Sequence, residues 1–162
     1  MEPKRRKRSS VYYGGRDRLS EMPDEVLIHI LSSMPTIDAV RTMLIRRFGN
    51  LWTLVHTLHF VVYTMAIDNK WTNGVERFNI FVRNMLMCHK RPVIDKFHLF
   101  LGPFYEGGRE DAGDDIKMWL KFALDKQAKE IYFCYVYYVY ILPDIPNFTS
   151  ESLVTLELCN CY

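Results

Sequence analysis

One short apolar frame recurs three times in the second half of this sequence. The frame has apolar residues at its first, fourth and sixth positions. Its three copies begin at Ile94, Ala128 and Leu153. Alternation by two is typical of a strand with one buried face. Each such strand leaves an apolar stripe that only a stacked neighbour covers. The frame therefore predicts parallel strands with helices on one side; the alternative is an ordinary α/β domain without repeats.

The third copy of the frame fits the leucine-rich-repeat pattern L-x-x-L-x-L-x-x-N/C at every fixed position, from Leu153 to Cys161. In such an array the outward-facing strand positions line up on the concave face. Those positions are Lys96, His98, Glu130, Tyr132, Thr155 and Glu157. We expect a substrate-binding surface of this region to include them, although their mixed charges define no particular ligand.

Between residues 57 and 161 the sequence alternates between strand and helix patterns. Alternating apolar residues predict β structure over 57–67, 94–101, 130–140 and 153–161, and helical spacing predicts helices over 75–89 and 116–128. Residues 71–74 and 102–115 are interpreted as loops. The predicted fold class is α+β leaning to α/β.

The segment from residue 21 to residue 55 is predicted to hold three short helices. An apolar face of Val26, Leu27, Ile30, Leu31 and Met34 marks the first helix, which Pro35 ends. The second is expected over residues 37–42 and the third over 43–55, where an interior Gly49 costs about 1 kcal/mol against alanine. Three such helices cannot bury all their apolar faces against one another, so part of this surface is predicted to contact a partner.

The chain begins with a basic run that is set apart from the rest. Its five consecutive cations are Lys4, Arg5, Arg6, Lys7 and Arg8. Such a run stays solvated, and it is a candidate nuclear-import signal, a solubilising tail or a weak nucleic-acid patch. The formal net charge is only +2, so the body that follows is neutral to acidic. We expect the protein in the nucleus, the cytoplasm or both.

Composition and motifs narrow the class of function. A hydrophobic content of 49% excludes a wholly disordered chain, and the longest apolar stretch, residues 54–67, is broken by two histidines and too short to cross a bilayer. No phosphate-binding loop, nucleophile elbow or H-E-x-x-H motif occurs. The four cysteines lack ligand spacing and are expected to be free thiols. The sequence predicts no enzyme, no cofactor and no metal.

The N-terminal residues resemble the F-box of plant F-box/leucine-rich-repeat (FBD-associated) proteins. The resemblance begins with Asp17-Arg18-Leu19-Ser20-Glu21-Met22-Pro23-Asp24-Glu25-Val26-Leu27-Ile28-His29-Ile30-Leu31-Ser32 and continues through Met34-Pro35-Thr36, Asp38-Ala39-Val40-Arg41-Thr42, Arg46-Arg47-Phe48 and Asn50-Leu51-Trp52. It implies a substrate receptor of an SCF-type, cullin-based ubiquitin ligase. In that family the F-box docks on a Skp-family adaptor and the repeats select the target protein.

Carried over by position, the resemblance implies a set of adaptor-binding residues. They are Leu19, Met22, Pro23, Val26, Ile30, Leu31, Met34, Val40, Leu44 and Trp52. Each is an apolar anchor of the kind that gives a helix-in-groove contact its affinity. Packing in the protein's own core is the alternative role for every one of them.

The resemblance also implies a domain order. A disordered basic tail is expected over residues 1–16, a three-helix F-box over 17–62, a linker and helix over 63–92, and a partial leucine-rich-repeat solenoid over 93–162. Family members continue through more repeats, so a truncated non-functional paralogue is one alternative. A nucleic-acid-binding protein whose third helix enters a groove is the other.

Overall fold

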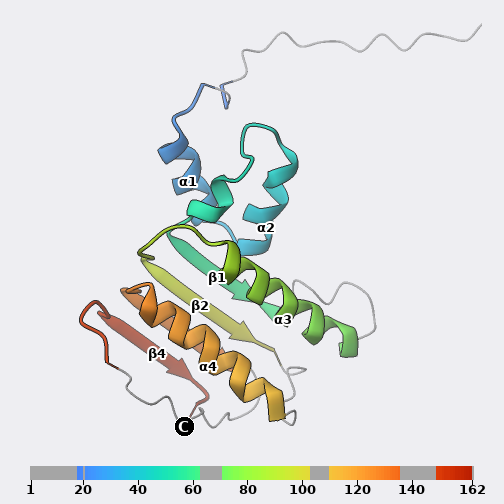
Figure 1. The fold of residues 1–162 in the computed structure, drawn as a ribbon, viewed down its shortest axis with the longest axis vertical. Helices are drawn as coiled ribbons and strands as arrows, with labels where there is room; N and C mark the ends of the chain where they lie inside the picture. The colour runs from blue at the N-terminus through green and yellow to red at the C-terminus, as the bar shows by residue number, and fades with distance from the viewer. Residues whose placement is uncertain (1–17, 20, 63–70, 103–109, 136–148, 162) are drawn as a thin grey trace, which may run out of the picture.

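A four-stranded parallel sheet forms the centre of the protein (Figure 1). The structure, a computed structural model, describes residues 18–19, 21–62, 71–102, 110–135 and 149–161. The strands are β1 (Thr57–Val61), β2 (Lys96–Leu101), β3 (Glu130–Tyr135) and β4 (Thr155–Cys159), and they lie side by side in sequence order. The described chain is therefore a mixed α/β structure, as the strand and helix patterns predict.

The register of the sheet follows the repeated apolar frame. Phe97 pairs with Ile131, and Ile131 pairs with Leu156. The three copies of the frame therefore align as their spacing predicts. Strand β1 carries the same frame, because Leu58 pairs with Phe97, and this fourth copy was not expected from the sequence.

Two helices cover one face of the sheet, α3 (Trp71–Cys88) and α4 (Glu110–Asp125) (Figure 1). Phe78 of α3 and Trp119 of α4 are buried and meet edge to face, with ring centroids 5.9 Å apart. Phe81 of α3 meets Phe60 of β1 in the same way, at 6.1 Å. Burying side chains of this size stabilises the fold by about 1.5–3 kcal/mol each.

Both helices begin earlier than their apolar spacing predicts. The expected loop over residues 71–74 is the first turn of α3, and residues 110–115 of the expected loop over 102–115 belong to α4. Acidic residues in the first turns of α4 favour the positive end of the helix dipole. The buried carboxylate of Asp115 also accepts hydrogen bonds from Asn79 and Arg83 of α3, both at 2.9 Å. These polar contacts extend α4 beyond its apolar stripe.

A helical unit lies beside β1 at one end of the sheet (Figure 1). It comprises α1 (Asp24–Ser32), α2 (Thr36–Arg41) and two short 3-10 turns, η1 (Thr42–Leu44) and η2 (Leu51–Leu54). The first two helices lie where they were predicted. Asp24 and Glu25 occupy the first turn of α1, where negative charge is favourable.

The third predicted helix, over residues 43–55, is wrong. The backbone turns between η1 and η2, with Ile45 extended at ψ 115° and Gly49 at φ 41°. A left-handed φ suits glycine and ends an α-helix. Phe48 still reaches the core from this turn. The groove-entering helix that the nucleic-acid alternative requires is therefore absent from these residues.

The strands also bear on the expected domain order. Strand β1 falls inside the predicted segment 17–62, although it pairs with β2. Helix α3 falls inside the segment 63–92. The predicted tail, residues 1–16, lies outside the described residues. No helix in the described part of the chain has both the length and the apolar character to cross a membrane.

Candidate functional site

The helical unit exposes several large apolar side chains, which we call the adaptor surface after the docking role that the F-box resemblance implies for this segment. Its members are Leu19, Val26, Ile30, Met43, Leu44 and Ile45. Leu44 is the most open of them, with 87% of its surface exposed. Pro23, at the start of α1, is exposed as well. Large apolar side chains that are left exposed gain stability when a partner covers them.

Some predicted adaptor-binding residues lie in the protein's own core. Leu31 is only 1% exposed, so it packs in the core, which is the alternative role stated for it. Met22, Met34, Val40 and Trp52 are half-buried and pack against the core. Helical spacing finds an apolar face, but it does not distinguish the part that faces the core from the part that faces a partner.

Met43 and Ile45 are members of the adaptor surface that sequence reasoning missed. A continuous helix over residues 43–55 would have placed them away from Leu44. The observed 3-10 turn and the extended Ile45 instead expose Met43, Leu44 and Ile45 in succession. Gly49 is the sequence feature that indicates an interruption of the predicted helix over residues 43–55.

Arg47 fixes the turn that follows η1 to the start of α1. Its guanidinium donates to the Asp24 carboxylate at 2.6 Å and also to the Met22 carbonyl. The Pro23 carbonyl accepts hydrogen bonds from the backbone N–H groups of Val26 and Leu27. Two segments that are distant in sequence are therefore held together beneath the adaptor surface.

Two buried hydroxyl groups join the helical unit to the sheet. The backbone N–H of His59 donates to Thr36 Oγ1 at 2.7 Å, and that of His56 donates to Ser32 Oγ at 3.0 Å. Ser32 Oγ in turn donates to the Ile28 carbonyl at 2.7 Å. Thr36 thereby satisfies one outward N–H group of β1, and Ser32 satisfies one just before the strand; both would otherwise be unpaired at the sheet edge.

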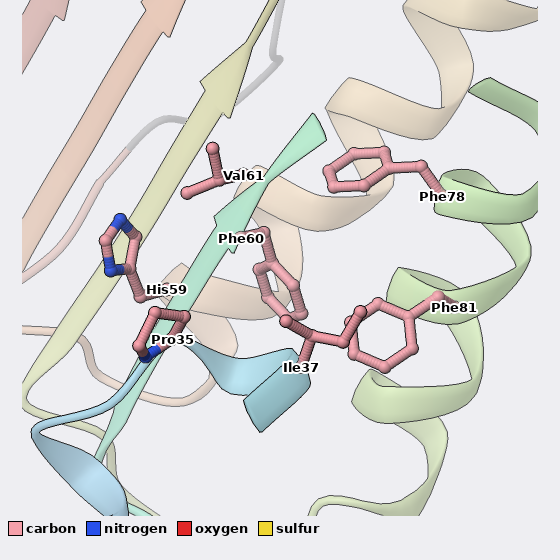
Figure 2. A pocket seen from close by; sticks show the side chains of 7 residues that line it. All are labelled: Pro35, Ile37, His59, Phe60, Val61, Phe78 and Phe81. Atoms are coloured by element: carbon pink, nitrogen blue, oxygen red, sulfur yellow. The ribbon is translucent and has the colours of Figure 1, made fainter. Parts of the chain in front are cut away.

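A shallow hollow lies next to this junction (Figure 2). Its lining is Pro35, Ile37, His59, Phe60, Val61, Phe78 and Phe81. Figure 2 shows the rings of Phe60 and Phe81 on the side of β1 that faces α3 and the ring of His59 on the other side. Burial lowers the pKa of His59. A lining with one titratable side chain offers no acid–base pair for catalysis.

The predicted substrate-binding residues lie together on the sheet face opposite α3 and α4, which we call the open face. Lys96, Glu130 and Thr155 form one row across β2, β3 and β4, and His98, Tyr132 and Glu157 form the next. Glu130 accepts from Lys96 Nζ and pairs with His98 Nε2, both at 2.7 Å. The Lys96 hydrogen bond is the main reason that the pKa of Glu130 is lowered.

An aromatic cluster accompanies these rows. Phe100 stacks on Tyr132 with centroids 4.8 Å apart, and His98 contacts Tyr132 at 5.7 Å. His59 contacts Phe100 at 5.2 Å. His59 and Phe100 were not predicted: the first lies on the unrecognised fourth copy of the frame, and the second lies one step beyond the predicted row on β2.

The described cysteines are free thiols, as predicted. Cys159 Sγ donates to the Tyr132 hydroxyl at 3.3 Å. Burial raises the pKa of Cys134, and it raises that of Cys161 to about 11, so both thiols are protonated and poorly nucleophilic at neutral pH.

Within the described ranges, no group of three or more His, Cys, Asp or Glu side chains is placed to hold a metal ion. The candidate import run, residues 4–8, lies outside those ranges.

Comparison with known proteins gives one domain match and several relatives. Residues 19–59 match the F-box domain. The chain is 32% identical over 157 residues to an F-box/FBD/LRR-repeat protein of Arabidopsis thaliana, covering 91% of this chain and 35% of the relative. An Arabidopsis FBD-associated F-box protein is 33% identical over 89% of this chain and 32% of its own length. The chain thus spans about a third of these relatives. No solved structure matches it significantly.

Proposed function

Because residues 19–59 form an F-box domain in a chain homologous to the Arabidopsis F-box/FBD/LRR-repeat proteins, we propose that it is a substrate receptor of an SCF-type, cullin-based ubiquitin ligase. The helical unit docks a Skp-family adaptor, and the sheet presents a target protein for ubiquitination. The observation that carries this proposal is the adaptor surface, which lies within the F-box match and leaves Leu44 87% exposed.

The adaptor surface supports docking through its exposed apolar side chains. Val26 and Ile30 lie about one helical turn apart on α1, and Leu44 is exposed on η1. A partner that covers apolar surface gains about 25 cal/mol for each Å² removed from water. A few such anchors commonly supply most of the affinity of an interface. Leu31 and Trp52 contribute indirectly, by supporting the helices that carry the anchors.

The sheet supports the second half of the proposal. Four parallel strands with one apolar frame, and two helices on one face, support the proposal of a leucine-rich-repeat solenoid. We propose that the described strands are its first repeats and that the open face contacts the target. The receptor itself supplies positioning rather than bond chemistry, which makes it a non-catalytic subunit.

The experiment is a binding assay between the purified chain and a Skp-family adaptor. The double variant Ile30→Glu, Leu44→Glu introduces two charges into the adaptor surface and is expected to abolish binding. The matched control, Met87→Glu with Met118→Glu, introduces the same charges at exposed apolar positions of α3 and α4. It should bind as the unmodified chain does. Failure of the unmodified chain to bind, or equal loss in both variants, would contradict adaptor docking.

We also propose that residues 4–8 direct nuclear import, on the strength of their five consecutive cations. Removing Lys4, Arg5, Arg6, Lys7 and Arg8 from a fluorescently tagged chain should shift it from the nucleus to the cytoplasm. An unchanged distribution would remove this proposal and leave adaptor docking untouched.

A further inference from the structure

The two carboxylates of the open face have different surroundings. Glu130 is engaged on both oxygens, by Lys96 and by His98 at 2.7 Å. Glu157 lies on the edge strand β4, is exposed, and makes no ion pair with any residue that the structure describes. The negative charge of Glu130 is therefore balanced within the protein, whereas that of Glu157 is available to a partner.

The aromatic residue next to Glu157, Tyr132, has ring partners from β2, and among the described residues no ring contact is found on its β4 side. Tyr132 on β3 stacks on Phe100, which comes from β2. Glu157 is the register neighbour of Tyr132 on the opposite side, on β4. The Cys159 thiol donates to the Tyr132 hydroxyl and so holds the ring in place. A ring face and a carboxylate thus flank one position on the open face.

The charges around this position favour a cation. Lys96, the basic residue of the rows on β2 to β4, is paired with Glu130. Burial lowers the pKa of His59, which keeps that imidazole neutral at pH 7. The Cys159 hydrogen bond and burial raise the pKa of Tyr132, so its phenol is neutral as well. Glu157 therefore leaves this part of the open face negative.

We propose that the open face binds a basic, extended protein segment, with one arginine side chain seated between the ring of Tyr132 and the carboxylate of Glu157. A guanidinium stacks on an aromatic face and pairs with a carboxylate at the same time, because it is planar and permanently charged. The inference rests on the proposed function, since it names the chemistry of the target that the receptor would recognise.

The test uses the full chain and two labelled peptides of equal length. One alternates arginine with glycine, and the other replaces each arginine by citrulline, which keeps the shape and removes the charge. Fluorescence anisotropy at physiological salt should show the arginine peptide binding at least about fivefold more tightly, as a cation–aromatic contact and one exposed ion pair together provide. Equal affinity of the two peptides would overturn the inference.

Single-residue variants test whether the arginine side chain binds at Tyr132 and Glu157. Glu157→Gln and Tyr132→Leu should each weaken binding of the arginine peptide about threefold to fivefold. Glu76→Gln, which removes an exposed carboxylate from α3, should leave it unchanged. An equal effect of Glu157→Gln and Glu76→Gln would mean general charge attraction and would overturn the inference.

Adaptor binding by the same variants separates the two proposals. Variants that keep the adaptor and lose the peptide are folded and support the open-face site. A chain that binds the adaptor but neither peptide loses only this inference. A chain that binds the arginine peptide but no adaptor retains the open-face site and loses the proposed function.

Discussion

The two ends of the sheet carry the same apolar frame in opposite environments. At the β1 end, Leu58 is fully buried under α3, and Thr36 caps the strand's outer edge. At the β4 end, Leu156 occupies the equivalent register position and is 41% exposed among the described residues. The repeated frame therefore specifies where a strand pairs, whereas the covering elements decide how much its side chains stabilise the fold.

The largest difference in stability is expected between two single variants that truncate the equivalent leucine at each end of the sheet. Leu58→Ala is expected to lower the free energy of unfolding by about 2–5 kcal/mol, because it leaves a cavity in the core. Leu156→Ala should cost about 1 kcal/mol or less, since much of its surface is already in water. Urea unfolding followed by circular dichroism measures both. Equal losses would break the comparison.

A polar substitution at the junction should have the next largest effect. Thr36→Val keeps the shape and removes the acceptor for the His59 N–H, which leaves a buried donor unpaired. We expect a loss of about 1–3 kcal/mol. Thr155→Val on β4 is the control and should change stability by no more than about 0.5 kcal/mol. Comparable losses would mean that the junction does not hold β1 in the way described.

Position 49, in the turn that replaces the predicted third helix, should accept few residue types without a loss of stability. Gly49→Ala forces a methyl-bearing residue to adopt φ 41° and is expected to cost about 1 kcal/mol. Gly49→Asn should cost less, because asparagine adopts the left-handed region more readily. Thermal unfolding of the two variants ranks them. A stabilising effect of Gly49→Ala would indicate a helical backbone at this position instead.

The smallest effect is a pH dependence confined to the β1 end. Burial lowers the pKa values of His56, His59 and His89. The unfolded chain therefore binds protons at these sites first, and stability should fall as the pH decreases from about 6.5. His89→Gln should reduce the slope of unfolding free energy between pH 7.5 and 5.5. An unchanged slope would show that protonation of His89 is not linked to unfolding.

The sequence predicted most of the sheet and four of the six residues of the adaptor surface. The register of β2, β3 and β4 follows from a frame that side-chain alternation imposes on each strand. Strand β1 is predicted as β structure but not as a copy of the frame, because Val55, the first residue of that copy, falls in the helix predicted over residues 43–55. Leu44 and Ile30 are exposed as docking requires, whereas Leu31 is not. Periodicity alone could not separate these cases, since tertiary packing decides which part of an apolar face is covered.

The capping of β1 also limits how copies of this protein can associate through their strands. Strand addition needs unpaired N–H and C=O groups along a sheet edge. Thr36 accepts the outward N–H of His59 in β1, and Ser32 accepts the N–H of His56 just before the strand. A strand added beside β1 would have to displace Thr36 from the His59 N–H. The hydroxyl groups that anchor the helical unit thus also oppose edge-to-edge pairing of two molecules at β1.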